Sequence, residues 1–406
     1  MEKKKMKMGK TRNAARSRSR IYLDYASATP VDPRVLKAMA PYWDIISGNP
    51  GALHEEGVSA KQALTDARSR VAHLLHARAS EMIFTGSGTE ANNLAIMGTV
   101  AALERRGVLL ESMHLIVSAI EHESVLAPAG ELERRGVKVT LVSPEPSGIV
   151  SAEKIMSEMR PETVLVSLQA ANHEIGTIQP VPELGRKVKA WRTLHKADLP
   201  YFHSDASQAA LLLNVSVDRL SVDLMTLDAQ KIYGPKGVGA LYKRQGAVLS
   251  PVLFGGRQEQ GLRPATENIP AIVGMAAALS LAFQEREKEY ARLRKLQELF
   301  LRSLEEKVPS ASVNGDRRKR LPSNVNVSLP GRDGELLALA LDAEGIAVTT
   351  KSACAESEEK ISSVVRALGK SEEEAKATLR FSFGKKTRVA DIRRAVETLA
   401  MLVARK

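Results

Sequence analysis

Cysteine is nearly absent from this chain, which has one, Cys354, among its 406 residues. A single cysteine excludes a disulfide within the chain and a metal site built from clustered cysteines. It favours a reducing compartment, and we expect a cytoplasmic protein without a bound metal. Apolar runs of the roughly eighteen residues that a membrane helix needs are also missing, as is a secretory signal. The sequence therefore predicts no membrane partner.

Acidic residues are scarce at the N-terminus. Residues 1–20 hold nine Lys and Arg but one Glu, a net charge of +8 out of the +12 of the whole chain, so residues 21–406 carry only about +4. The first twenty residues have no apolar periodicity, and we expect a disordered basic tail. A solvated extension is the simplest interpretation of the tail. Weak contact with nucleic acid or ribosomes and an organelle transit peptide are the alternatives.

From residue 82 onwards, apolar segments of strand length alternate with amphipathic segments of helix length. This alternation predicts βαβ units and a mostly parallel sheet, with ligands beyond the carboxyl ends of its strands. A long helix is expected over 272–307, followed by an α+β arrangement. We therefore expect a large domain over 32–288 and a small domain formed by 21–31 with 289–406. The sheet strands are expected at 82–84, 115–117, 137–142, 164–168, 201–203 and 222–227.

Lys231 lies in a short polar segment between two apolar runs, 222–227 and 238–242. This spacing predicts a lysine at the end of a strand, where two rigid elements hold its amine in place. A partly buried lysine loses its proton readily and can condense with the carbonyl group of a cofactor. Taken alone, Lys231 is more simply interpreted as a solvated loop lysine.

Further polar segments follow other predicted strands. Thr89 lies where a glycine-rich turn enters a helix, and its hydroxyl and the free N–H groups suit a phosphate, although a structural turn explains the glycines equally well. His122 could stack on a flat ring or carry a proton, or simply begin a helix. Asp205 could hold the protonated nitrogen of a pyridine ring, or cap a helix. Together with Lys231 and the segment around Asn172, these residues predict one composite active site.

A series of motifs makes the chain resemble the cysteine desulfurases of the class V aminotransferase family, pyridoxal-phosphate (PLP) enzymes of fold type I. The resemblance runs from Ile21 to the C-terminus and omits only the tail. It implies a large domain with a mostly parallel seven-stranded sheet between helices, plus a smaller α+β domain. The motifs are YLDYASATPVDPRV, GNPG, TGSGTEANNLAI, EHESVL, NHEIGTIQP, DASQ, QKIYGPKGVGALY, GGRQEQGLRPATEN, SAC and LRFSFG.

The resemblance implies a role for each matching residue. Lys231 would form the Schiff base, and Cys354 would be the nucleophile. The distance in sequence from Cys354 to Arg380 resembles the long-loop, NifS/IscS-like branch, and the polar surroundings of Cys354 suit a reactive thiol. The residues expected around the phosphate are Gly88, Thr89, Asp228 and Gln230, and Thr266 would reach the phosphate of the partner subunit in a homodimer. On the ring, Asp205 would bind the pyridine nitrogen, Gln208 would bind the hydroxyl and His122 would stack. Asn172 and Arg380 would bind the substrate carboxylate.

Beside Lys231, this chain has Asp-Ala-Gln-Lys where the family usually has Ser-Gly-His-Lys, so both side chains that bind the phosphate in the family, the serine and the histidine, are replaced. Gln230 can still donate a hydrogen bond, but an ionised Asp228 cannot. About 4 Å from a phosphate charge, Asp228 would cost on the order of 4 kcal/mol at an effective dielectric of 20. We therefore predict that Asp228 points away from the phosphate, towards a backbone N–H or a cation. His173 and Arg257 also replace the commoner Asn and Gly, at positions expected to be more tolerant.

The expected reaction is the removal of sulfur from L-cysteine, which gives L-alanine and a persulfide on Cys354. The persulfide would pass to an acceptor protein in iron–sulfur cluster assembly or tRNA thiolation. The alternatives are a related PLP enzyme, such as a transaminase or selenocysteine lyase, and a non-catalytic assembly scaffold. Transamination needs no nucleophilic thiol, and only the changes at 228 and 230 support a scaffold. The acceptor, the turnover and the role of the tail stay open.

Overall fold

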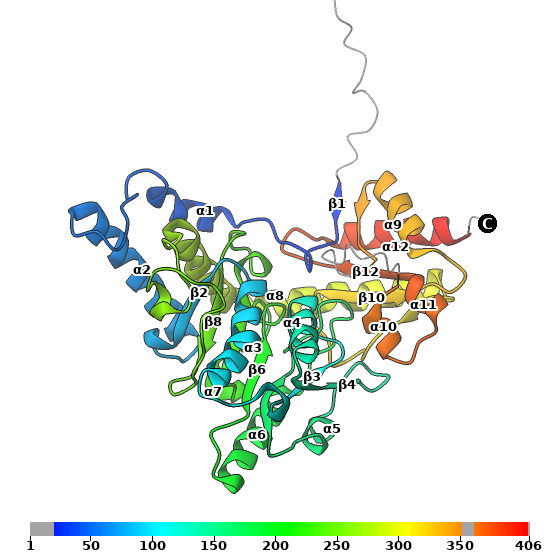
Figure 1. Cartoon of the computed structure of the whole chain (residues 1–406). Helices are drawn as coiled ribbons and strands as arrows, with labels where there is room; N and C mark the ends of the chain where they lie inside the picture. The colour runs from blue at the N-terminus through cyan, green and yellow to red at the C-terminus, as the bar shows by residue number, and fades with distance from the viewer. Residues whose placement is uncertain (1–19, 351–360, 405–406) are drawn as a thin grey trace, which may run out of the picture.

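The central sheet of the described part of the chain has seven strands, and β8 is the one that runs against the others (Figure 1). The computed structural model describes residues 20–350 and 361–404. The strand order is β2-β8-β7-β6-β5-β3-β4. The predicted, mostly parallel α/β sheet is confirmed. Its strands are β2 (Met82–Thr85), β3 (His114–Ser118), β4 (Lys138–Val142), β5 (Thr163–Ser167), β6 (Tyr201–Asp205), β7 (Leu224–Asp228) and β8 (Gly239–Lys243).

Both faces of this sheet are covered by helices. Strand side chains point alternately to opposite faces, so Ile83 of β2 joins one apolar cluster, and Met82 and Phe84 join the other. The strands are therefore buried on both sides, which explains their continuous apolar runs. The first face packs against α3 (Gly88–Glu104) and α4 (Glu123–Arg134), and the second against α2 (Glu55–Leu74), α5 (Ala152–Ser157), α6 (Val181–His195) and α8 (Ile269–Lys307).

A smaller group of strands lies beside the central sheet. The order β12-β10-β9 is antiparallel, and β1 pairs with β11 in parallel. These strands are β1 (Ile21–Tyr22), β9 (Ser312–Val313), β10 (Asn324–Ser328), β11 (Ile346–Ala347) and β12 (Thr378–Ser382). The remaining helices are α1 (Pro33–Met39), α7 (Val217–Leu220), α9 (Gly334–Ala343), α10 (Ser363–Ala367), α11 (Glu372–Lys376) and α12 (Val389–Ala404).

The N-terminal segment of the described chain joins the C-terminal part. In addition to the β1–β11 pair, Asp24 forms a bridge with Ser382 of β12. However, α8 continues across the predicted domain boundary at 288, and the largest apolar cluster extends from the central sheet to Phe300 and Phe381. The division into a large domain (32–288) and a small domain (21–31 with 289–406) stays a prediction.

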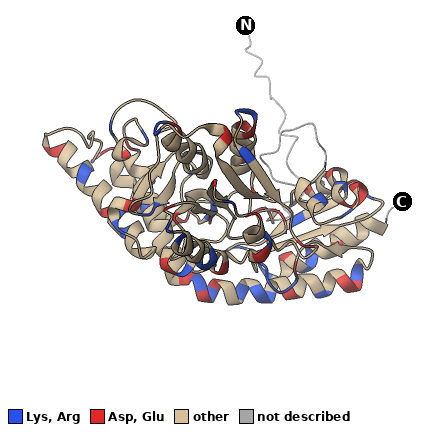
Figure 2. Ribbon diagram, turned by 60° about the horizontal axis from the view of Figure 1, so that its bottom comes forward, with Lys and Arg blue, Asp and Glu red and all other residues tan. Residues whose placement is uncertain are grey.

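Charges of both signs are interspersed over the ribbon outside the grey segments (Figure 2). This mixture is in line with the small net charge of residues 21–406. Residues 1–19 of the predicted tail lie outside the described residues, whereas Arg20 forms an ion pair with Asp342 of α9. Among the helices that the structure describes, none has the length and apolar character needed to cross a membrane.

Candidate active site

A cavity opens where the strands of the central sheet end. Segments that follow β2, β3, β5, β6 and β7 contribute to its lining, because the carboxyl ends of these strands meet at one edge of the sheet. Segment 21–31 and β12 close the cavity from the other side. The structure therefore brings most of the predicted site together, namely Gly88, Thr89, His122, Asp205, Gln208, Asp228, Gln230, Lys231 and Arg380.

Lys231 ends the short 3₁₀ turn Ala229–Lys231 that follows β7. Its Nζ donates hydrogen bonds to the carbonyl oxygens of Ala26, at 3.0 Å, and Ser27, at 2.6 Å. The side chain is partly buried in the cavity wall. Lys231 is thus not the solvated loop lysine of the simpler interpretation, since its amine is held at a defined position inside the cavity.

Asp205, the last residue of β6, presents a carboxylate to the cavity. Its Oδ2 accepts a hydrogen bond from Asn92 Nδ2 at 2.8 Å, and its Oδ1 accepts one from the N–H of Ser207 at 2.9 Å. Glu121 lies nearby, fully buried, and burial, together with the charge of Asp205, raises its pKa well above the ordinary value. Burial and the neighbouring carboxylate thus disfavour the charged form of Glu121, and Asp205 is the carboxylate that faces this end of the cavity.

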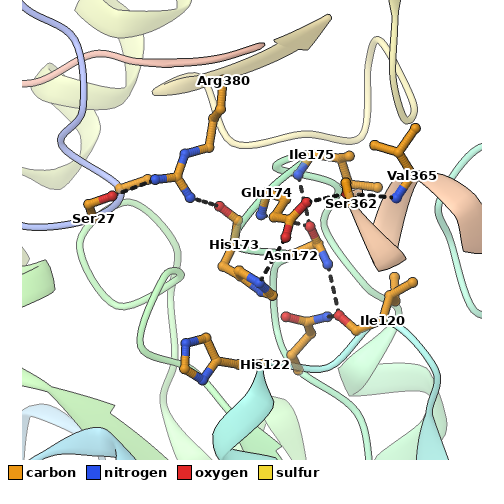
Figure 3. A network of polar contacts seen from close by, with 12 residues as sticks. Ser27, Ile120, His122, Asn172, His173, Glu174, Ile175, Ser362, Val365 and Arg380 are labelled. Atoms are coloured by element: carbon orange, nitrogen blue, oxygen red, sulfur yellow. Dashed lines mark hydrogen bonds and ion pairs between the residues drawn. The ribbon is translucent and has the colours of Figure 1, made fainter. Parts of the chain in front are cut away.

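Two imidazole rings, those of His122 and His173, meet edge to face in the cavity, with their centroids 5.1 Å apart (Figure 3). His122 precedes α4, and its Nδ1 accepts a hydrogen bond from the N–H of Ser124, which assigns the proton of the neutral ring to Nε2. Burial, followed by electrostatic interactions with His122, Arg380 and Lys231, lowers the pKa of His173 well below its ordinary value. The cavity thus holds a second, neutral imidazole.

Sequence reasoning missed His173, which it treated as a tolerant replacement for Asn. The ring is 7% exposed and lines the cavity, and its Nδ1 has no hydrogen-bond partner among the described residues. The signal that could have found it is its place immediately after Asn172 in a segment beyond β5, where polar side chains face the strand ends.

Arg380, in β12, is 2% exposed and connects this strand to segment 21–31 and to the segment that follows β5 (Figure 3). Its Nη1 donates to the carbonyl oxygen of His173 at 2.8 Å. Its Nη2 donates to Asp24 Oδ1 at 2.9 Å and to Ser27 Oγ at 2.6 Å. Its Nε is buried and has no partner in the described part of the chain. Because an unsatisfied buried donor is costly, Nε is the group that an incoming carboxylate would satisfy.

Asn172, unlike these residues, is fully buried and turns its side chain into the protein (Figure 3). Its Nδ2 donates to the carbonyl oxygen of Ile120 at 2.9 Å, and its Oδ1 accepts from the N–H groups of Glu174 and Ile175, both at 2.8 Å. The structure does not bring Asn172 or Thr266 into the cavity lining. Cys354 lies outside the described residues, so its predicted role is not tested.

The start of α3 forms the other end of the cavity. Gly88 is the first residue of this helix, and a Cβ on Gly239 of β8 would come within 2.8 Å of its nitrogen, so a glycine at 239 lets the turn lie against the sheet. Asp228 Oδ2 lies 3.3 Å from the Gly88 nitrogen and 3.1 Å from Gln230 Nε2. Asp228 thus bonds to a backbone N–H, but this N–H is one that was predicted to bind the phosphate.

The residues present fit a pyridine-ring cofactor. Asp205 offers a carboxylate for the ring nitrogen, His122 offers a flat ring, and Lys231 offers an amine at a strand end. Gln208 lines the same wall and donates through Nε2 to the carbonyl oxygen of Ala26 at 3.0 Å. This fold and this set of side chains define a PLP-dependent enzyme of fold type I.

The sequence signature of the family Aminotransferase class-V matches residues 21–395, and the chain belongs to this family, within its NifS/IscS-like branch. It is 39% identical to "Cysteine desulfurase IscS" of Dictyoglomus turgidum, covering 94% of each chain. It is 38% identical to "Cysteine desulfurase IscS 1" of Archaeoglobus fulgidus, over 95% of this chain and 97% of the relative. A solved structure named "NIFS-LIKE PROTEIN" superposes with a TM-score of 0.86 at 31% identity, covering 95% and 99% of the two chains.

Proposed function

We propose that this protein is a PLP-dependent cysteine desulfurase, which converts L-cysteine to L-alanine and leaves the sulfur as a persulfide on Cys354. The observation that carries the proposal is the convergence of three side chains in one cavity. Asp205 and Lys231 come from the ends of β6 and β7 in the central sheet, and Arg380 comes from β12, much later in the chain. The names of the relatives, which are 38–39% identical over nearly the whole chain, support the same reaction.

The cofactor would be held by residues from both ends of the cavity. Lys231, Asp205, His122 and Gln208 would hold the ring, and Thr89 in the first turn of α3 would contribute to the phosphate site. When bound, PLP supplies an electron sink for the bonds broken at the substrate Cα. Asp205 would keep a proton on the ring nitrogen, because a carboxylate next to that nitrogen favours its charged, protonated form.

The chain's own groups then perform the binding and proton transfers. Arg380 binds the carboxylate of L-cysteine through Nε, and its bonds to Asp24 and Ser27 fix the direction of approach. Lys231 Nζ takes the Cα proton. The Cys354 thiolate attacks the substrate sulfur, so that a sulfur–sulfur bond forms as the carbon–sulfur bond breaks. The electron pair of the broken bond stays with carbon. The proton of the substrate thiol passes through His122 Nε2 to Cβ, and Lys231 Nζ returns its proton to Cα, which completes alanine.

The proposal includes the partners and the domains. We propose a homodimer in which Thr266 reaches the phosphate site of the partner subunit. The absence of Thr266 from the cavity lining and the exposure of Trp43 (64%), Leu53 (97%) and Phe254 (76%) support this part.

An acceptor protein in iron–sulfur cluster assembly or tRNA thiolation would take the sulfur, and the single cysteine supports a cytoplasmic location. Residues 21–31 with 289–406 would form the small domain.

Release of sulfide and alanine from L-cysteine, in the presence of a reductant and with or without added PLP, tests the proposal. Wild type should release both in equal amounts, and Cys354→Ala should release neither while it keeps the absorbance band of bound PLP. A band without sulfide or alanine from the wild type would overturn desulfuration and point to another amino acid substrate. Neither band nor product, even with excess PLP, would favour the non-catalytic scaffold.

A further inference from the structure

Asp228 places a carboxylate at the end of the cavity where α3 begins. Oδ2 lies 3.3 Å from the Gly88 nitrogen, and a Cβ on Gly88 would lie 3.2 Å from the same oxygen. The first N–H groups of a helix attract anions, since they have no partner within the helix. In this chain, a negatively charged side chain already lies at that position.

The position of Asp228 is well determined by its contacts. The residue is 8% exposed and ends β7, so its backbone belongs to the central sheet. Oδ1 accepts from the N–H of Gln230 at 3.1 Å, and Oδ2 accepts from Gln230 Nε2 at 3.1 Å. Three hydrogen bonds therefore fix the carboxylate, one from the start of α3 and two from Gln230, and it is not a side chain that swings freely at the rim of the cavity.

The charge of this carboxylate is not neutralised by a neighbouring cation. Among residues 20–350 and 361–404, Asp228 forms no ion pair with a Lys, Arg or His. Lys231, three residues on, donates to the carbonyl oxygens of Ala26 and Ser27. A phosphate dianion that enters this end of the cavity therefore meets a like charge, which weakens its binding.

We propose that Asp228 makes this protein accept cofactor forms without a phosphate charge. Pyridoxal, which has the same reactive ring but an uncharged hydroxymethyl group, would bind nearly as well as PLP, because the carboxylate repels a phosphate charge and already accepts from the first N–H of α3. Asp228 is thus a specificity-determining residue for the cofactor. This inference rests on the proposed function, since it assumes that the ring binds beside Lys231.

Direct binding measurements on the full-length protein test the inference without reference to activity. The protein, stripped of cofactor, is titrated separately with PLP and with pyridoxal, and the absorbance change that is absent from Lys231→Ala is used to obtain each Kd. For the wild type, the two Kd values should lie within about tenfold of each other. Asp228→Asn, which removes the charge and keeps the shape, should tighten PLP by at least tenfold and change pyridoxal by less than threefold.

Asp218→Asn is the matched control, because Asp218 is an exposed aspartate of α7 that bonds to His76 and lies outside the cavity lining. It should leave both Kd values unchanged. Asp228→Ser is a second variant, which adds a hydroxyl donor and should also tighten PLP. If Asp228→Asn or Asp228→Ser fails to fold, as judged by circular dichroism, the ratio of the two wild-type Kd values decides the question alone.

Two results would overturn the inference. One is a wild type that binds PLP more than a hundredfold more tightly than pyridoxal. The other is a folded Asp228→Asn variant that binds PLP with an unchanged Kd. Failure of the proposed function looks different, because neither compound would then give a Lys231-dependent absorbance change with wild type or variant.

Discussion

The two ends of the active-site cavity are built in different ways. At the ring end, the cavity wall holds Asp205 and His122, which are proposed to bind the pyridine ring, and Arg380, which is proposed to bind the substrate carboxylate. At the phosphate end, a carboxylate, Asp228, is bonded to Gly88, where a phosphate is expected. In the proposed function, the reacting groups of the substrate meet the ring end, whereas the phosphate takes no part in the reaction.

This difference separates two properties that are usually measured together. The chemistry depends on the ring end, so substitutions there should reduce turnover even when the cofactor is bound. Retention of the cofactor depends on both ends, so substitutions at the phosphate end should change the Kd with little effect on turnover of the loaded enzyme. The following predictions test this separation, from the largest expected effect to the smallest.

Replacement of Lys231 should have the largest effect. We expect Lys231→Ala to lower alanine release by at least about 10³-fold, because the substitution removes both the covalent attachment and the amine that takes the Cα proton. Lys236→Ala is the matched control, since Lys236 is an exposed lysine of the same segment between β7 and β8. Borohydride reduction followed by mass spectrometry should find the cofactor attached in the control. Attachment in Lys231→Ala at another lysine, with activity retained, would contradict the assignment.

Asp205→Asn should reduce turnover by about 10² to 10³-fold, which corresponds to the loss of a charge-assisted interaction of about 3–4 kcal/mol at the ring nitrogen. The measurement is alanine release at saturating PLP and L-cysteine. The Kd for PLP should rise much less, because Lys231 still binds the ring. Equal losses in PLP binding and in turnover would show that Asp205 acts mainly by retaining the cofactor. This result would contradict the separation of roles between the two ends of the cavity.

Protein stability should fall at mildly acidic pH because of His203, which lies in β6 two residues before Asp205. Burial lowers the pKa of His203 to about 4, below the value of about 6.5 in the unfolded chain. The unfolded state therefore binds more protons between pH 6.5 and 4, and the free energy of unfolding decreases as the pH falls through this range. Between pH 7 and pH 5, we expect His203 to contribute a loss of about 2 kcal/mol.

Urea unfolding at pH 7 and pH 5, for wild type and His203→Asn, measures this contribution. The variant lacks the titrating ring and should lose about 2 kcal/mol less than the wild type over this pH range. The buried Glu121 acts in the opposite direction, because its raised pKa means that the folded state binds this proton more tightly than the unfolded state, but Glu121 is present in both proteins and cancels in the difference. Equal losses in the two proteins would contradict the prediction.

Gln230→Ala should have the smallest effect. The amide of Gln230 holds Asp228 through one neutral-to-charged hydrogen bond, and such a bond contributes about 0.5–1.5 kcal/mol or slightly more. We expect a change in the Kd for PLP of about threefold to tenfold and turnover within twofold of the wild type. A loss of turnover larger than the change in Kd would show that the phosphate end also orients the reacting groups.

Much of the fold and most of the site could be predicted from the sequence. The strands follow from apolar runs with a polar segment at each end, and Lys231 and Asp205 lie where the strand ends place them. The resemblance of motifs added the roles of Arg380 and Gln208, which have no local pattern of their own.

The parts that could not be predicted depend on side-chain direction. Nothing in the sequence shows that Asn172 bonds to Ile120 and turns inward, while the neighbouring His173 faces the cavity. Likewise, Asp228 was expected to find a backbone N–H, but a sequence cannot show that Gly88 would supply it. Such directions depend on contacts between segments that are distant in the chain, and a motif match describes each segment separately.

The contacts of segment 21–31 also have a consequence for the order of assembly during synthesis. Ala26 and Ser27 bond to Lys231, and Asp24 and Ser27 bond to Arg380, so the sequence separations are about 205 and about 355 residues. At roughly 5–20 residues per second, these partners leave the ribosome on the order of tens of seconds after the segment itself. Segment 21–31 is therefore synthesised early but gains its contacts late. The active site can form only when the chain is almost complete.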